Sequence, residues 1–256
     1  MSSNRTKSQK APIVLIHGWG MNRQIWQGVI EHLPSEVAAR VVALDMPGYG
    51  DNQVGEIEMN FDGLVSWLEE QVTVPSILIG WSLGGLVAQR LAIKSPEKVI
   101  QLGLVATTPH FVQRADWPGI KPQVLAMFAK QLSQDHASLI DKFMAIQAMG
   151  SETAKQDIRK IKHWVLSKPT PASNVLAAGL NMLETIDLRS DLKYLPENTH
   201  VLLGKLDSLV PVKAAEQILD SKPNLNVTVV DKASHAPFIS HPQEFTKWLL
   251  NMGNED

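Results

Sequence analysis

One short segment constrains the fold of this chain more than any other: Gly80-Trp81-Ser82-Leu83-Gly84. It follows the apolar run Pro75–Ile79 and precedes the helical pattern Leu83–Ile93, which predicts a sharp turn from a buried strand into a helix. Such a turn strains the backbone of its central residue, so the positions two before and two after it must be small. Both are glycine here. We therefore predict that the Ser82 hydroxyl stands clear of a sheet, at the positive end of a helix.

Short runs of aliphatic and β-branched residues recur along the chain, and helical patterns separate them. The runs predict buried parallel strands over Ile13–Ile16, Arg40–Leu44, Ser76–Ile79, Val99–Val105, Val201–Leu203 and Val227–Val230. The helical patterns, each near turn or breaker residues, cover Arg23–Leu33, Phe61–Gln71, Leu83–Ile93, Lys213–Leu219 and Gln243–Leu250. This alternation predicts an α/β fold with a doubly wound, mostly parallel sheet, whose ligands bind beyond the carboxyl ends of the strands.

The alternation stops between Thr108 and Ile186, where helical periodicity continues without a strand. Four helices are predicted there, over Gln123–Leu132, Ala137–Met149, Thr153–Leu166 and Ser173–Leu183. We expect residues 109–186 to form a helical cap inserted into a core made of residues 11–108 and 187–256. Such a cap would wall a pocket and exclude water from it.

Composition excludes several classes of function. The chain has no cysteine, which rules out disulfides, thiolate catalysis and cysteine-ligated zinc. Its formal net charge of -2 argues against a whole-molecule nucleic-acid binder. Residues 1–10 are polar, which predicts a flexible N-terminus without the apolar core of a signal peptide, and no apolar run reaches membrane-spanning length. We expect a soluble, cytoplasmic monomer with no membrane partner.

A serine nucleophile needs a base, and the base needs a carboxylate that fixes its tautomer. On strand-to-helix elbows of this kind the chain order is Ser, then Asp or Glu, then His. Asp207 follows the predicted strand Val201–Leu203, and His235 lies in a loop of small residues after the last strand. We predict a triad of Ser82, Asp207 and His235, with no metal or organic cofactor, because an oxyanion hole supplies the electrophilic assistance.

Alternative acids and bases have weaker contexts. Asp231 is nearer to His235 in sequence, but it lies where the last strand ends and is expected to cap a turn. Among the other histidines, His241 is expected at a helix start. Five more lack a motif and are expected on the surface or in packing: His32, His110, His136, His163 and His200.

The loop His17-Gly18-Trp19-Gly20 follows the first predicted strand. In elbow hydrolases one oxyanion donor comes from this loop and the other from the residue after the nucleophile. We assign the two donors to the backbone N–H groups of Trp19 and Leu83, a role in which the side chain is expected to matter little. His17 is expected to brace the loop by hydrogen bonding.

With these residues assembled, the chain resembles the α/β-hydrolase superfamily over nearly its whole length. Four segments resemble one family within it, the pimeloyl-acyl-carrier-protein methyl ester esterases of biotin biosynthesis: Gly80–Ala88, Asp116–Pro122, Gln147–Ala154 and His235–Pro242. Two of these lie in the cap, which usually diverges fastest among hydrolases. Family members usually begin with an extra aromatic-rich strand, whereas the first ten residues here are polar, so we expect a short edge of the sheet.

The resemblance implies that an acyl-enzyme on Ser82 hydrolyses the methyl ester of pimeloyl-carrier protein to methanol and pimeloyl-carrier protein. It also implies that a stretch of the second cap helix lines the substrate channel beside Trp19, Ser82 and Leu83. That stretch consists of Phe143, Met144, Ala145, Ile146 and Gln147.

An acyl-carrier protein is acidic, so its docking surface should be basic. Lys155, Arg159 and Lys162 share one face of the predicted third cap helix, and Lys142 is expected nearby. We hypothesise that they receive the carrier; an ordinary solvated face is the alternative. Two other functions remain open, a general short-chain carboxylesterase acting on free small esters and a non-catalytic receptor on the same fold.

Overall fold

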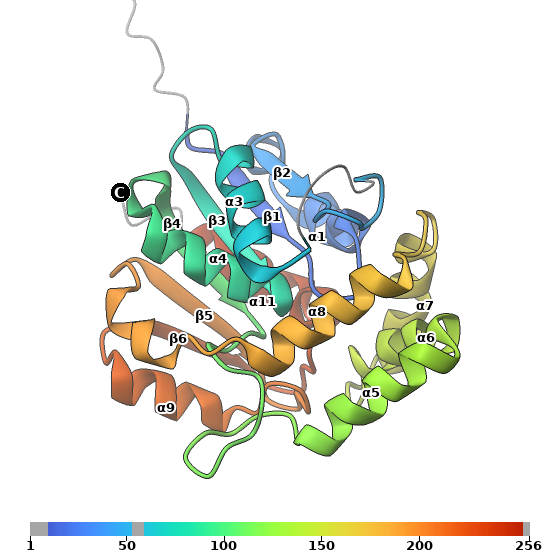
Figure 1. Cartoon of the computed structure of the whole chain (residues 1–256). Coiled ribbons are helices and arrows are strands. Elements are labelled where there is room, and N and C mark those ends of the chain that lie inside the picture. Colours follow the sequence, from blue (N-terminus) through green and yellow to red (C-terminus); the bar gives the residue numbers. More distant parts are fainter. Residues whose placement is uncertain (1–9, 53–58, 253–256) are drawn as a thin grey trace, which may run out of the picture.

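The computed structural model describes residues 10–52 and 59–252. Its six strands form one parallel sheet in the order β2-β1-β3-β4-β5-β6 (Figure 1). They are β1 (Ile13–Ile16), β2 (Val41–Leu44), β3 (Ser76–Trp81), β4 (Val99–Val105), β5 (Thr199–Gly204) and β6 (Asn226–Val230). Strands β1, β3 and β5 are buried along their whole length, whereas the edge strands β2 and β6 are partly exposed. The doubly wound parallel sheet predicted from the aliphatic runs is confirmed.

Helices cover both faces of this sheet. On one face α3 (Phe61–Gln71) packs on α4 (Leu83–Lys94), which lies against β3 and β4. On the other face α11 (Pro242–Met252) brings Trp248 against Gly103 of β4, next to the short helix α10 (Pro237–Ser240). The remaining core helices are η1 (Arg23–Trp26), α1 (Gln27–His32), α2 (Ser35–Ala38), η2 (Pro96–Lys98), η3 (Arg189–Tyr194) and α9 (Lys213–Ser221).

Four α-helices between β4 and η3 gather at one side of the sheet (Figure 1). They are α5 (Pro122–Gln134), α6 (His136–Ile146), α7 (Ala154–Val165) and α8 (Ser173–Thr185). Helix α5 packs on α6 and α8, and α6 packs on α7. We call these four helices the cap.

Two predicted helices differ from those observed. The segment predicted as one helix from Arg23 begins as a 3₁₀ turn, because the Asp45 carboxylate takes the Arg23 N–H at 2.6 Å and the Asn22 side chain takes that of Gln24. The second cap helix ends at Ile146 rather than Met149. There the Gln147 side chain donates to the Phe143 carbonyl at 2.8 Å. Short helices such as α2 were missed because four residues carry too little periodicity.

The prediction for residues 1–10 lies outside the described residues except for Lys10. Among the described residues, no helix is both long enough and apolar enough to cross a membrane.

Candidate active site

Ser82 occupies the turn between β3 and α4 in a strained conformation. Its φ of 55° and ψ of -121° lie in a region that residues other than glycine rarely adopt. Strand β4 and the loop after it hold Ser82 there, since its N–H donates to the Val105 carbonyl at 3.0 Å and its own carbonyl accepts from the Thr107 hydroxyl at 2.8 Å. The expected elbow is present.

The two glycines of the elbow are required by close backbone approach. A Cβ on Gly80 would lie 2.5 Å from the Gly84 carbonyl oxygen, and one on Gly84 would collide with the His17 carbonyl oxygen. Neither obstacle is a flexible side chain that could swing away. The prediction that both positions must be small is therefore confirmed, and the reason is packing of α4 onto β3 and the end of β1.

The structure brings the three predicted triad side chains together. His235 Nε2 lies 3.0 Å from Ser82 Oγ, and His235 Nδ1 lies 2.7 Å from Asp207 Oδ2. The other carboxylate oxygen of Asp207 accepts the N–H groups of Leu209 and Val210 at 2.8 and 2.9 Å. With Nδ1–H donating to Asp207, Nε2 is left to accept the serine proton. All three residues are buried, so water competes little for these bonds.

Asp231 takes no part in this arrangement. Its carboxylate forms an exposed ion pair with Lys205 at 2.7 Å, and the hydrogen bond from Lys205 lowers the pKa of Asp231. Asp231 was expected to cap a turn, and the contact that its carboxylate makes is this ion pair. The carboxylate that contacts His235 is that of Asp207.

His17 braces the loop after β1, as predicted. Its Nε2 accepts the Met46 N–H at 3.0 Å, while Nδ1 lies 2.8 Å from the Gly18 carbonyl and donates to it. Complete burial lowers the pKa of His17 to about 4. The ring is therefore neutral near pH 7 and acts as a hydrogen-bonding link between two loops.

The two predicted oxyanion donors belong to segments that lie next to Ser82. Leu83 is the first residue of α4, so its N–H has no acceptor within the helix. Gly18, which precedes Trp19, approaches so closely that a Cβ on it would lie 3.0 Å from Ser82 Cβ. Outside regular helices and strands, no described backbone carbonyl accepts either N–H.

The assignment of the Trp19 N–H as a donor gave the side chain no part, and the structure shows that this side chain has contacts of its own. The indole is fully buried, its Nε1 donates to the Leu176 carbonyl of α8 at 2.8 Å, and its ring meets Phe143 edge-on at 4.7 Å between centroids. A side chain with these contacts ties the loop after β1 to the cap.

The five residues from Phe143 to Gln147 contact different parts of the molecule. Phe143, Met144 and Gln147 are buried, and Ala145 and Ile146 are partly so. Phe143 packs on Trp19, and the Gln147 carbonyl accepts the Ala236 N–H at 3.1 Å beside His235. Of the five, Ile146 lines the cavity described next.

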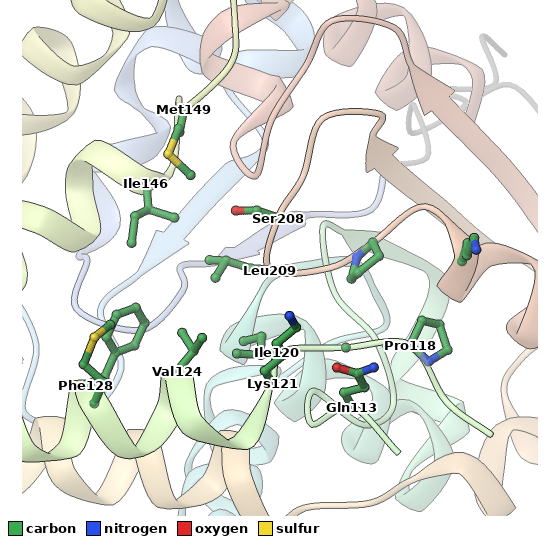
Figure 2. A pocket seen from close by; sticks show the side chains of 14 residues that line it. Gln113, Pro118, Ile120, Lys121, Val124, Phe128, Ile146, Met149, Ser208 and Leu209 are labelled. Atoms are coloured by element: carbon green, nitrogen blue, oxygen red, sulfur yellow. The ribbon is translucent and has the colours of Figure 1, made fainter. Parts of the chain in front are cut away.

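An apolar cavity of about 490 Å³ lies between the cap and the core. In Figure 2, Val124 and Phe128 rise from α5 on one side, Ile146 and Met149 lie opposite, and Leu209 faces the space between them. Ser208 and Leu209, which follow Asp207 in the chain, are part of its lining, whereas the three triad side chains are not. Its lining suits a long aliphatic chain.

The four predicted docking cations are not equivalent. Lys155 and Arg159 are exposed on α7, and Lys142 is exposed on α6. Lys162 is only partly exposed, and its ammonium pairs with Asp141 of α6 at 2.5 Å. Its charge is therefore partly neutralised within the cap.

Two residues at the site were not anticipated from the sequence. Trp81 donates from Nε1 to the His235 carbonyl at 2.8 Å, and Thr107 holds the Ser82 carbonyl. Both join segments distant along the chain, so no local pattern marks them. Among the described residues, no three His, Asp or Glu side chains gather as a metal site would require.

Comparison with known proteins places this geometry in a family. The family model of the alpha/beta hydrolase fold matches residues 11–242. The "Pimeloyl-[acyl-carrier protein] methyl ester esterase" of Aeromonas hydrophila is 46% identical over 243 residues, covering 93% of each chain. The chain belongs to this esterase family of α/β-hydrolases. The Klebsiella pneumoniae member is 44% identical, covering 93% of this chain and 91% of its own.

Solved structures extend the likeness of fold. The esterase EaEST from Exiguobacterium antarcticum matches with a TM-score of 0.83 at 20% identity, covering 96% of this chain and 93% of its own. A thermophilic esterase from Thermogutta terrifontis matches with a TM-score of 0.77 at 25% identity, covering 96% and 92%. The assignment to the esterase family therefore depends on the sequence relatives, whereas the assignment of the fold is also supported by solved structures.

Proposed function

We propose that this chain is a carboxylic ester hydrolase that releases methanol from the methyl ester of pimeloyl-acyl-carrier protein in biotin biosynthesis. The observation that carries the proposal is the 46% identity to an esterase of that name, over 93% of both chains, together with the Ser82, His235 and Asp207 contacts. A cytoplasmic monomer with the acyl-carrier protein as its partner fits this role.

In the first step Ser82 Oγ attacks the ester carbonyl carbon while its proton moves to His235 Nε2. The negative charge that develops on the carbonyl oxygen is stabilised by the N–H groups of Trp19 and Leu83, each worth about 3 kcal/mol. The bond to the methoxy oxygen then breaks, and the imidazolium returns its proton so that methanol leaves. The Asp207 carboxylate stabilises the imidazolium.

In the second step a water molecule replaces methanol. His235 Nε2 takes one of its protons as the water oxygen attacks the acyl carbon, and the bond to Ser82 Oγ breaks with return of that proton to the serine. The product is the free carboxylic acid, still attached to the carrier at its other end. Ser82 and His235 are then back in their starting protonation states, and the enzyme is regenerated.

The apolar cavity supplies a place for the substrate's chain. A pimeloyl chain with its methyl ester at Ser82 would cross the cavity beside Ile146 and Leu209, and its methylenes would gain about 0.8 kcal/mol each on burial. Lys142, Lys155, Arg159 and Lys162 would receive the acidic carrier outside, where Lys155 and Arg159 are exposed on α7. This docking is part of the proposal.

The experiment compares methyl pimeloyl-carrier protein with p-nitrophenyl acetate, using the wild type and Ser82→Ala. We expect kcat/KM to favour the carrier-bound ester, methanol to be released while the carrier thioester stays intact, and both activities to vanish in Ser82→Ala. Serine-dependent activity on the small ester alone would indicate a general short-chain carboxylesterase. Absence of turnover, with no labelling of Ser82 by an active-site phosphonate, would indicate a non-catalytic receptor.

A further inference from the structure

The Trp19 side chain is enclosed by two cap helices while its backbone belongs to the core. On one side the ring meets Phe143 of α6, and on the other Nε1 donates to the Leu176 carbonyl of α8. The indole is fully buried. Cap and core therefore meet at the residue that supplies one proposed oxyanion donor.

Helix α8 lies against the indole without spare room. A Cβ on Gly179 would lie 2.5 Å from Trp19 Cδ1 and 2.9 Å from Nε1. Since real Cβ atoms do not approach other atoms so closely, any larger residue at 179 would have to displace the indole or the helix. Gly179 thereby sets how near α8 comes to the loop after β1.

The same loop is confined on its other sides. A Cβ on Gly18 would lie 3.0 Å from Ser82 Cβ, and one on Gly20 would lie 2.9 Å from Ile140 of α6. The loop therefore lies between the nucleophile and the cap. Burial of the ring restricts rotation about the Cβ–Cγ and Cα–Cβ bonds of Trp19, so a shift of the indole also moves its backbone N–H.

We propose that α8 positions the oxyanion donor, with Gly179 and the Leu176 carbonyl acting as positioning groups through the Trp19 indole. This inference rests on the proposed function, because it takes the Trp19 N–H as a donor. Stabilisation of an oxyanion depends steeply on donor distance, so displacement of the cap would lower kcat without changing the binding of a small substrate.

The test uses p-nitrophenyl acetate, which is too short to depend on the cap for binding. Gly179→Ala is expected to lower kcat at least tenfold with KM within twofold of the wild type. A Trp19→Ala background keeps the backbone N–H and removes the two nearest atoms, which leaves only the Tyr49 hydroxyl oxygen 3.0 Å from the added Cβ. There the same change is expected to alter kcat less than twofold. Trp19→Phe, which keeps a ring and loses the bond to Leu176, is expected to lower kcat about fivefold.

The control is Ala177→Ser, which adds one atom on the exposed face of α8 and should leave kcat unchanged. Thermal unfolding of each variant separates loss of fold from loss of rate. If Trp19→Ala does not fold, the kcat of Trp19→Phe tests the inference in its place. Equal losses from Gly179→Ala in both backgrounds, or wild-type kcat in Gly179→Ala or Trp19→Phe, would overturn the inference. Failure of the wild type on the carrier-bound ester would instead refute the proposed substrate, since this readout uses only the small ester.

Discussion

Asp207, which contacts His235, and Asp231, which is close to it in the sequence, have opposite surroundings. Asp207 is buried, receives two backbone N–H groups and contacts His235, while Asp231 is exposed and paired with Lys205. The backbone donors hold the Asp207 carboxylate in one orientation, so its second oxygen is aimed at the imidazole. This difference makes the two residues a matched pair for mutation.

Asp207→Asn is expected to lower kcat for p-nitrophenyl acetate by about 10⁴-fold, because an amide cannot both fix the His235 tautomer and stabilise its cation. Asp231→Asn, the control, should keep the wild-type kcat. Steady-state kinetics on both variants check this. A comparable loss in Asp231→Asn would show that the acid has been assigned to the wrong residue.

The buried neutral His17 makes stability depend on pH. The unfolded chain takes up a proton on this histidine near pH 6.5 and the folded chain only near pH 4, so between these values the unfolded state binds more protons. The contribution of neutral His17 to the free energy of unfolding is complete above pH 6.5 and is lost as the pH falls to 4. It amounts to roughly 3 kcal/mol.

His17→Gln should therefore flatten the pH dependence of folding. We expect the free energy of unfolding of the wild type to fall about 3 kcal/mol more than that of the variant between pH 7 and pH 4. Urea denaturation at both pH values measures the free energy of unfolding of each protein. The effects of other titrating groups cancel when the variant is subtracted from the wild type. Parallel stability curves would contradict the neutral, buried state of this ring.

At the scale of elements, the site depends on how α4 leaves β3. The strained Ser82 persists because Gly80 and Gly84 let helix and strand approach each other and because β4 and its following loop hold the serine backbone. The start of α4 then presents the Leu83 N–H beside the nucleophile. The position of the serine is thus a property of one strand–turn–helix unit, whereas its proposed base, His235, comes from the loop after β6.

Gly84→Ala is expected to destabilise the fold by about 3 kcal/mol, because its Cβ collides with the His17 carbonyl and α4 must move. The displaced Leu83 should also lower kcat. Gly63→Ala in α3 is the control, and it should stabilise the chain by up to about 1 kcal/mol through helix propensity. Thermal unfolding checks both variants, and a Gly84→Ala protein as stable as the wild type would contradict the packing argument.

At the scale of the whole molecule, the cap faces both the site and the outside. Its inner side supplies Phe143 and Ile146, while α7 buries Ile161 and Val165 and exposes Lys155 and Arg159. The carbonyl of Val165 accepts from Asn22 of the core at 2.8 Å, which fastens α7 in place. A partner bound on α7 would therefore contact a helix that is attached to the core.

Lys155→Glu/Arg159→Glu should lower kcat/KM for the carrier-bound ester at least tenfold relative to p-nitrophenyl acetate. The reason is loss of attraction for an acidic partner, so the effect should diminish as salt rises. Lys193→Glu/Lys247→Glu, on core elements, changes the net charge equally and serves as the control. Equal losses on both substrates, or equal effects of both double variants, would place docking elsewhere.

Local signals were enough for much of the site. The elbow, its glycines, the strand before it and the helix after it could be predicted from backbone constraints that act within a few residues. Asp207 and His235 could be predicted from their places after strands. Other features depended on contacts across long stretches of chain. The end of α6 depends on Gln147, whose carbonyl meets Ala236, and the bond from Trp81 to His235 joins residues 154 apart.

The amino-acid sequence by itself determined the alternation of strands and helices, the turn that strains Ser82, and the residue types able to activate it. Those properties arise from sterics and periodicity along the chain. Only the tertiary structure decided that Asp231 faces Lys205, that Lys162 pairs with Asp141, and that the Trp19 indole is held by α6 and α8. The physical reason is that a side chain's partners are set by which distant surfaces are buried together, and no short pattern encodes that choice.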